Sequence, residues 1–155
     1  MARMLRSQQL DLLEALVRTA GRCAARLGRR PELPEHLEVG RRGEEAAFFY
    51  LRRRGFVVVA RGWRSKALRG DLDLIAWDGL TLCFIEVKTR TSRDSATAES
   101  AVDQEKSRML RRMARNYIQS MPGAPEQTRF DILSIYFGAG KPPEFEFFPN
   151  AFGWY

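Results

Sequence analysis

The sequence is poor in residues that carry imidazole and thiol chemistry. Among its 155 residues there is a single histidine, His36, and there are two cysteines, Cys23 and Cys83. One histidine in a segment read as a linker excludes histidine-based catalysis and His-rich metal sites on this chain alone. Two cysteines that lie far apart, with Cys83 on a strand expected to be buried, indicate reduced thiols and a cytoplasmic location.

Long uninterrupted hydrophobic segments are also missing. Residues 4–27 carry apolar side chains at helical spacing, but Asp11, Glu14 and Arg18 interrupt them in sequence, which excludes a transmembrane span and a secretory signal. The segment therefore predicts an amphipathic helix. An Arg-rich helix of this kind can lie on a membrane, but we expect it to pack on the domain or on a second subunit, with no membrane partner. The apolar stripe consists of Leu13, Leu16, Val17, Ala20, Cys23, Ala24 and Leu27.

Acidic residues are in deficit. Against 26 Lys and Arg there are 19 Asp and Glu, so the formal charge is +7 and the isoelectric point is near 10.0. A basic surface favours polyanions, either nucleic acid or an anionic membrane. The length fits one domain with a sizeable core. We divide the chain into an N-terminal helix with a proline-containing linker, residues 1–37, and an α/β domain, residues 38–155.

The segment from Gly70 to Arg90 predicts a β-hairpin. Its two strands are Asp71–Trp77 and Leu82–Thr89, and the Asp78-Gly79 pair between them is a strong turn signal. Both strands are apolar on both faces in the middle, as in strands covered by helices on each side.

Within the two predicted strands, charged residues lie only at the ends away from the turn. If Trp77 pairs with Leu80, then Asp71, Asp73, Glu86 and Lys88 all point to one side of the sheet, since side chains alternate with period two. Asp73 and Glu86 then become diagonal neighbours, roughly 7–8 Å apart at the backbone, so that their carboxylates can converge on one ion. An all-oxygen ligand set suits Mg²⁺ or Mn²⁺. The alternative is a ladder of salt bridges on a solvated edge.

The remaining elements predict helices on both faces of a mixed sheet. A helix over Gly40–Arg54 places Glu44 on its apolar stripe, either reaching towards the hairpin acids or favoured there by the helix dipole. The other predicted elements are a strand at Phe56–Ala60, a loop at Arg61–Arg69, a polar and mobile run after Arg90, a helix at about Glu99–Ser120, and strands at Arg129–Tyr136 and Phe145–Phe148. Asp131 either pairs with Arg129 or assists a site. Aromatic residues continue to Tyr155, where they cover the core or make a dimer contact.

Basic residues near the hairpin acids form a candidate nucleic-acid surface. The loop before Asp71 combines cations with an aromatic ring that could stack on a base, and the long helix directs a lysine towards the acids and several arginines away from them. Alternatives are a solvated loop, a lysine snorkelling at the rim of the core, and a solvated helix face. The candidates are Arg61, Trp63, Arg64, Lys66, Arg69, Arg90, Lys106, Arg108 and Arg112.

Asp73 followed by Glu86-Val87-Lys88 resembles the PD-(D/E)xK nuclease signature, in which an Asp begins one strand and Glu-x-Lys lies in the next. The wider pattern resembles the YraN-like uncharacterised bacterial proteins over about residues 38–137. The matching blocks are Gly40-x-x-Gly43-Glu44, Gly70-x-x-Asp73-Leu74-Ile75, Phe84 to Arg90, Ala101-Val102 with Lys106, and Arg129-Phe130-Asp131. One departure is Asp71, where that family usually has Glu.

This resemblance implies a restriction-endonuclease-like core, similar to Holliday-junction resolvases, with an extra N-terminal helix. It implies a metal-dependent endonuclease acting on DNA, including branched or damaged DNA. Asp73, Glu86 and the Val87 carbonyl would hold Mg²⁺ or Mn²⁺, and Glu44 would bind it directly or through water. Lys88 would orient the attacking water, and relatives of the resolvase type suggest a homodimer. Two alternatives are a non-catalytic nucleic-acid-binding module on the same scaffold and a protein-interaction adaptor.

Overall fold

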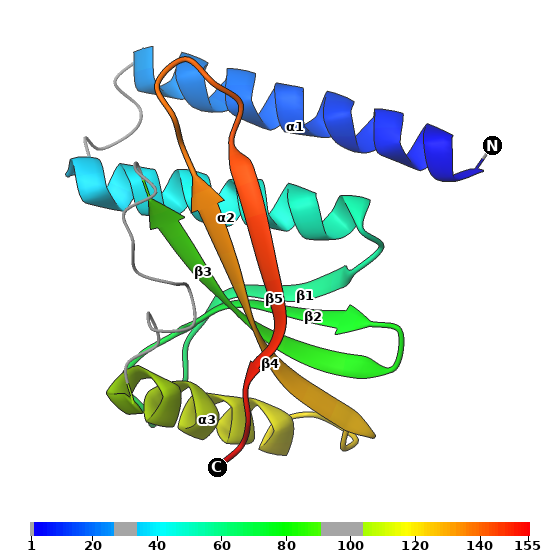
Figure 1. Ribbon diagram of the computed structural model, residues 1–155, viewed down its shortest axis with the longest axis vertical. Coiled ribbons are helices and arrows are strands. Elements are labelled where there is room, and N and C mark those ends of the chain that lie inside the picture. The colour runs from blue at the N-terminus through cyan, green and yellow to red at the C-terminus, as the bar shows by residue number, and fades with distance from the viewer. Residues whose placement is uncertain (1, 27–33, 91–103) are drawn as a thin grey trace.

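The computed structural model describes residues 2–26, 34–90 and 104–155 (Figure 1). The predictions for the linker at 29–33 and for the polar run and helix start at 91–103 lie outside these ranges. In chain order the elements are α1 (Ala2–Arg26), α2 (Glu35–Arg53), β1 (Val57–Trp63), β2 (Leu72–Asp78), β3 (Thr81–Arg90), α3 (Gln104–Gln119), β4 (Gln127–Tyr136) and β5 (Glu144–Phe152).

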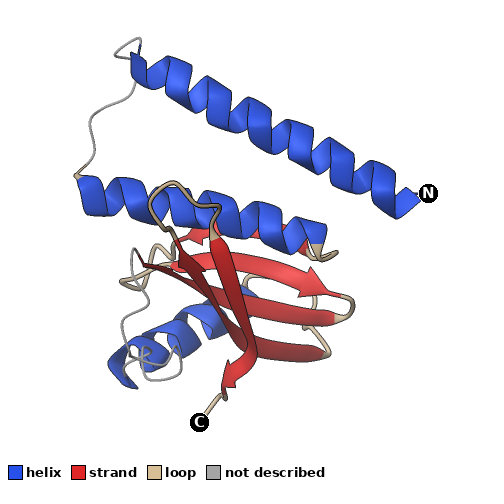
Figure 2. Ribbon diagram, turned by 45° about the horizontal axis from the view of Figure 1, so that its top comes forward, coloured by secondary structure: helices blue, strands red, loops and turns tan. Residues whose placement is uncertain are grey.

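The strands form one mixed sheet in the order β1-β2-β3-β4-β5. The β3–β4 pair is parallel, whereas β1–β2, β2–β3 and β4–β5 are antiparallel. A parallel pair needs a crossover connection, and α3 lies in the connection between β3 and β4. Helix α2 covers one face of the sheet and α3 the other, while α1 lies outside α2 (Figures 1 and 2). The expected α/β fold with a mixed central sheet is confirmed.

Each face of the sheet has its own hydrophobic core. Beneath α2 the core includes Ala47 and Leu51 of the helix with Leu74 and Ile85 of the strands. Beneath α3 it includes Leu110 and Met113 of the helix with Ile75, Phe84 and Phe130 of the strands. Alternate residues of one strand therefore belong to different cores, which explains why the middle of the hairpin is apolar on both faces.

The hairpin register differs from the predicted one by two residues. Trp77 pairs with Leu82, not with Leu80, and Asp78 pairs with Thr81. The turn is therefore Gly79-Leu80, not Asp78-Gly79, and Gly79 has the positive φ of 59° that favours glycine at the first position of a tight hairpin turn. Asp78 extends the ladder by one pair, which the Asp-Gly signal alone did not reveal.

The new register improves the convergence of the acids. Leu74 pairs with Ile85, where the β2–β3 ladder ends, so that Asp73 and Glu86 are the next positions of the two strands and are level in this register, not diagonal. A shift of two residues preserves the face on which each side chain lies. The prediction that Asp73, Glu86 and Lys88 share one side of the sheet therefore holds.

Three other predicted boundaries were wrong. Helix α2 begins at Glu35, before the predicted Gly40, so His36 lies in a helix and not in a linker. Strand β1 continues to Trp63, so the first residues of the predicted loop 61–69 are in the sheet. The pairing of β1 with β2 is irregular earlier in the strand, between Val58 and Ala60. Strand β5 runs to Phe152, beyond the predicted Phe148, and forms an edge of the sheet.

Helix α1 contacts α2 mainly through charged groups. Arg53 of α2 donates hydrogen bonds to Asp11 and forms an ion pair with Glu14, and Leu10 is buried. Of the stripe residues that the structure describes, none is buried, and Leu13, Leu16 and Val17 are exposed; Leu27 lies outside the described residues. Within the described ranges no helix combines the length and apolar character needed to cross a bilayer.

The aromatic C-terminal segment covers the core under α3. Phe152 stacks on Phe130 with ring centroids 4.8 Å apart, and Trp154 meets Phe130 at 4.8 Å and Phe84 at 6.5 Å. The indole Nε1 of Trp154 donates a hydrogen bond to Thr128. Of the two predicted roles, core coverage is the one observed. Helix α3 supports this segment through Arg111, which donates to the carbonyl oxygens of residues 153 and 155.

Candidate active site

The strand ends of β2 and β3 place three of the predicted site residues on the face covered by α3. Asp73 precedes Ile75 by two residues, and Glu86 and Lys88 follow Phe84 by two and four, so all three point to the side of the core that contains Ile75 and Phe84. Lys106 reaches the same place from the first turn of α3. Acids and lysines thus meet where the apolar core ends.

Glu86 is the centre of this group. It is only 4% exposed, and its Oε1 lies 2.9 Å from Lys88 Nζ and 3.2 Å from Lys106 Nζ. Its second oxygen, Oε2, is buried and has no hydrogen-bond partner among the described residues. A buried carboxylate oxygen without a partner is costly, so this atom is the one best suited to bind a cation.

Asp73 has an unusual affinity for protons. Burial, followed by the negative charge of Glu86, raises its pKa from 3.8 to about 7. A hydrogen bond from the backbone N–H of Val87 to Asp73 Oδ2 at 2.8 Å and the charge of Lys106 act in the opposite direction. A buried carboxyl group whose pKa is raised by a neighbouring carboxylate is typical of sites that bind cations or handle protons.

Glu44 approaches the group from α2. Burial raises its pKa, Arg61 lowers it and Asp71 raises it, and the charge of Glu44 in turn raises the pKa of Asp73. Within the described chain, however, no three Asp, Glu, His or Cys side chains converge closely enough to hold a metal ion. The Asp73–Glu86 pair is therefore the core of the site, with Glu44 within electrostatic range.

The donor set fits a divalent cation. The residues present supply carboxylate oxygens from Asp73 and Glu86 and, on β3 between Glu86 and Lys88, the carbonyl of Val87. Oxygen ligands suit Mg²⁺ and Mn²⁺, and the unpartnered Oε2 of Glu86 is an observation of this structure that such an ion would satisfy.

Two glycines allow the helices to approach the site closely. A Cβ on Gly43 of α2 would overlap the hydroxyl of Thr89 at the end of β3, and a Cβ on Gly70 would come 2.5 Å from Met109 Sδ of α3. Gly70 also has a φ of 108°, which other residues rarely adopt. Both glycines belong to the sequence blocks named above, Gly40-x-x-Gly43-Glu44 and Gly70-x-x-Asp73. Their close contacts bring α2 to the end of β3 and α3 to the start of β2.

The predicted nucleic-acid residues fall into three groups. Arg61 lies over the Phe48 ring at 5.1 Å, Arg64 pairs with Asp71 at 3.4 Å, and Trp63 packs edge-on against Tyr117 at 5.2 Å. Lys106 points to the acids, as predicted. Exposed or partly exposed cations without an ion pair among those described here are Lys66, Arg69, Arg90, Arg108 and Arg112.

Asp131 lies away from this site. It is fully buried on β4, level with Ile85 on the face covered by α2, and it accepts hydrogen bonds from Arg129 and from the backbone N–H of Asn150. Arg129 also binds Asp78 near the hairpin turn at 2.8 Å. Of the two roles predicted for Asp131, pairing with arginine is the one observed.

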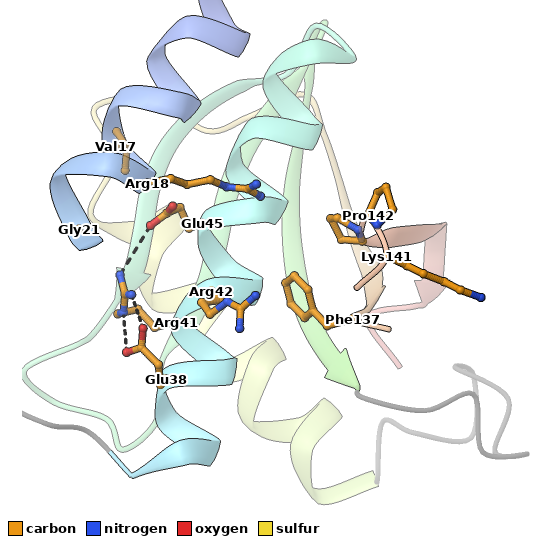
Figure 3. Close-up of a pocket in the computed structure, with 11 residues that line it drawn as sticks. Val17, Arg18, Gly21, Glu38, Arg41, Arg42, Glu45, Phe137, Lys141 and Pro142 are labelled. Atoms are coloured by element: carbon orange, nitrogen blue, oxygen red, sulfur yellow. Dashed lines mark hydrogen bonds and ion pairs between the residues drawn. The ribbon is translucent and has the colours of Figure 1, made fainter. Parts of the chain in front are cut away.

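A separate cavity of about 540 Å³ lies between α1, α2 and the connection from β4 to β5 (Figure 3). Arg41 within it pairs with Glu38 and Glu45, and Arg42 lies over the Phe137 ring at 4.9 Å. Sequence reasoning missed this cavity, because it depends on the position of α1 and of a loop far away in the chain. None of its lining residues belongs to the carboxylate site.

The mixed five-stranded sheet with helices on both faces, and the acids at the ends of β2 and β3, define an α/β protein with a restriction-endonuclease-like core. Residues 43–135 match the family model described as Uncharacterised protein family UPF0102, and the chain belongs to this family. A UPF0102 protein of Koribacter versatilis is 54% identical over 113 residues, covering 72% of this chain and 78% of the relative. One from Solibacter usitatus is 45% identical over 131 residues, covering 84% and 96%.

Proposed function

We propose that this protein is a metal-dependent nuclease that hydrolyses phosphodiester bonds in DNA, with branched or damaged DNA as the expected substrates. The observation that supports this most directly is the pairing of Asp73 with Glu86, whose buried Oε2 has no hydrogen-bond partner among the described residues. The family resemblance of the Asp73 and Glu86-Val87-Lys88 pattern to PD-(D/E)xK nucleases supports the same conclusion.

In this proposal Asp73, Glu86 and the Val87 carbonyl hold Mg²⁺ or Mn²⁺, with Glu44 binding through water. The ion would supply Lewis-acid stabilisation of the phosphate and of the attacking water. Lys88, whose ammonium lies 2.9 Å from Glu86 Oε1, orients the water and stabilises negative charge that develops on the phosphate.

The DNA backbone would contact exposed cations on either side of the acids. Lys66 and Arg69 lie in the connection from β1 to β2, and Arg108 and Arg112 lie one turn apart on the exposed side of α3. We leave Trp63 out of this surface because its ring packs on Tyr117. Phosphate contacts of this kind predict DNA binding that weakens steeply as salt is added.

Calorimetric titration with Mg²⁺ and Mn²⁺, with and without a DNA duplex, tests the proposal. We expect wild-type protein to bind the ion and Asp73→Ala/Glu86→Ala to lose binding. Cleavage of branched, nicked and single-stranded substrates should require the ion and should disappear in Lys88→Ala. Metal-dependent cleavage that survives Glu86→Ala or Lys88→Ala would show that these roles are wrong.

A second candidate is a nucleic-acid-binding module that does not cleave. One observation favours it: Lys88 and Lys106 both form ion pairs with Glu86. Glu86 can therefore stabilise the fold through these pairs without a bound metal ion. Salt-sensitive DNA binding by a protein that binds neither Mg²⁺ nor Mn²⁺, even with DNA present, would favour this candidate over the nuclease.

A further inference from the structure

Lys106 is tied to the candidate site through its charge. Its ammonium lies 3.2 Å from Glu86 Oε1, and it also lowers the pKa of Asp73. The side chain comes from α3, whereas both acids and Lys88 come from the sheet. Lys106 therefore links α3 to Glu86, whereas the other charged groups of the site come from the sheet.

Two lysines occupy the surroundings of Glu86 when no metal ion is bound. The ammonium groups of Lys88 and Lys106 lie 2.9 Å and 3.2 Å from Glu86 Oε1. A divalent cation bound by this carboxylate would lie close to both ammonium groups, and like charges at such short range repel strongly. Metal binding and the present arrangement of both lysines therefore oppose each other.

Of the two lysines, Lys106 is the one that can leave. Lys88 lies on β3, two residues from Glu86, where the strand pairs with β4, and its ammonium is the closer to the shared oxygen, at 2.9 Å against 3.2 Å for Lys106. The two side chains are similarly exposed, 25% for Lys88 and 31% for Lys106, but Lys106 comes from α3, outside the sheet. Rotation about its side-chain bonds would move the ammonium into solvent without disturbing the sheet.

We propose that Lys106 is the countercation of the Asp73–Glu86 pair before a metal ion binds, that the ion displaces it, and that the displaced ammonium then contacts the phosphate of the substrate. This inference rests on the proposed function. It makes Lys106 a positioning residue that couples binding of the ion to binding of DNA. If release of Lys106 by the ion strengthens DNA binding, then DNA must strengthen binding of the ion by the same factor, because coupling between two ligands is reciprocal. Lys106 therefore weakens metal binding in the absence of DNA and strengthens DNA binding in the presence of metal.

The first test is Mg²⁺ titration of Lys106→Met by calorimetry. We expect metal binding about tenfold tighter than in the wild type, within the usual range of such couplings. Lys141→Met is the matched control, because it removes one positive charge from an exposed lysine that lines the separate cavity and not the carboxylate site, and it should leave the affinity within about twofold. Affinity in Lys106→Met that equals or falls below the wild-type value would overturn the inference.

The second test measures affinity for a DNA duplex with nuclease-resistant phosphorothioate linkages. Lys106→Met should bind this duplex roughly tenfold more weakly than wild type at saturating Mg²⁺ and about equally without Mg²⁺. Equal weakening in both conditions would identify a permanent phosphate contact and would contradict displacement. Should Lys106→Met fail to fold by circular dichroism, Lys106→Gln, which is polar and unbranched, takes its place.

The outcomes separate this inference from the nuclease proposal. Metal binding by wild type that is lost in Asp73→Ala/Glu86→Ala, together with unchanged affinity in Lys106→Met, refutes the role of Lys106 alone. Absence of metal binding in both wild type and Lys106→Met refutes both. Metal binding only in Lys106→Met would contradict displacement, because the ion would then fail to replace the lysine in the wild-type protein.

Discussion

Gly43 of α2 lies against Thr89 of β3 so closely that no side chain fits between them. This contact is the point where α2 approaches the strand that carries Glu86 and Lys88. A glycine in a helix interior lowers the stability of the helix. Its presence at position 43 is explained by the close approach of α2 to β3, which leaves no room for a Cβ.

Gly43→Ala should therefore destabilise the protein although alanine is the better helix former. The added Cβ must displace Thr89 or the helix, and overpacking of this kind costs roughly 1–3 kcal/mol in the free energy of unfolding. Gly40→Ala is the matched control on the same helix, since a Cβ there meets nothing within 4 Å, and it should stabilise by about 0.5–1 kcal/mol. Urea unfolding measures both, and similar effects of the two substitutions would contradict the close approach.

Asp73 should make stability depend on pH. Its pKa of about 7 in the folded protein, against 3.8 ordinarily, means that the folded state binds more protons than the unfolded state between these values. Ionisation of Asp73 therefore costs more in the folded than in the unfolded protein, so the free energy of unfolding falls as the pH rises from about 4 to 7. Asp73→Asn should match wild type near pH 4 and exceed it by roughly 1–3 kcal/mol at pH 8.

Urea unfolding of wild type and Asp73→Asn across this pH range checks the sign. The control is Asp71→Asn, which removes a neighbouring acid that is partly exposed and pairs with Arg64. A difference between wild type and Asp73→Asn that stays constant with pH, or that shrinks as the pH rises, would show that the pKa of Asp73 is not raised in the folded protein.

Trp154→Ala should loosen the core beneath α3. The substitution removes ring contacts to Phe84 and Phe130 and the hydrogen bond to Thr128, for a loss of about 2–3 kcal/mol in a partly buried aromatic. Tyr155→Ala should change little, because that side chain is fully exposed and Arg111 binds the Tyr155 backbone oxygen. Thermal unfolding of the two variants measures the difference, and equal unfolding temperatures would contradict packing of the aromatic C-terminal segment on the core.

Asp131→Asn tests whether this acid is structural. It is fully buried and holds Arg129 and the N–H of Asn150, and loss of one partner of a buried ion pair costs roughly 3 kcal/mol. Asp78→Asn, which affects the other contact of Arg129 at a more exposed site, should cost less than about 1 kcal/mol. If the proposed nuclease activity is observed, folded Asp131→Asn should retain it, and its selective loss would place Asp131 in the site.

Strand parity explains what the sequence could predict about the acids. Asp73 and Glu86 share a face under either hairpin register, because both registers preserve the alternation along each strand, and helical spacing directed Lys106 to the same side. Their direct opposition was not predictable, since it depends on whether Asp78 ends the strand or belongs to the turn. One further prediction changed for a tertiary reason: Trp63 was expected to stack on a base, but its ring packs on Tyr117 of α3. These two residues are far apart in sequence.

The strand that carries Glu86 and the helix that carries Lys106 should open on different timescales. Glu86, Val87 and Lys88 pair with β4 on one side, beyond the end of the β2 ladder at Ile85, and the N–H of Val87 is bonded to Asp73. We therefore expect their backbone amides to exchange with solvent deuterium only when this part of the sheet opens. Lys106 reaches Glu86 from α3 through a side chain that is 31% exposed, so its ammonium can leave Glu86 by side-chain rotation while the sheet stays closed.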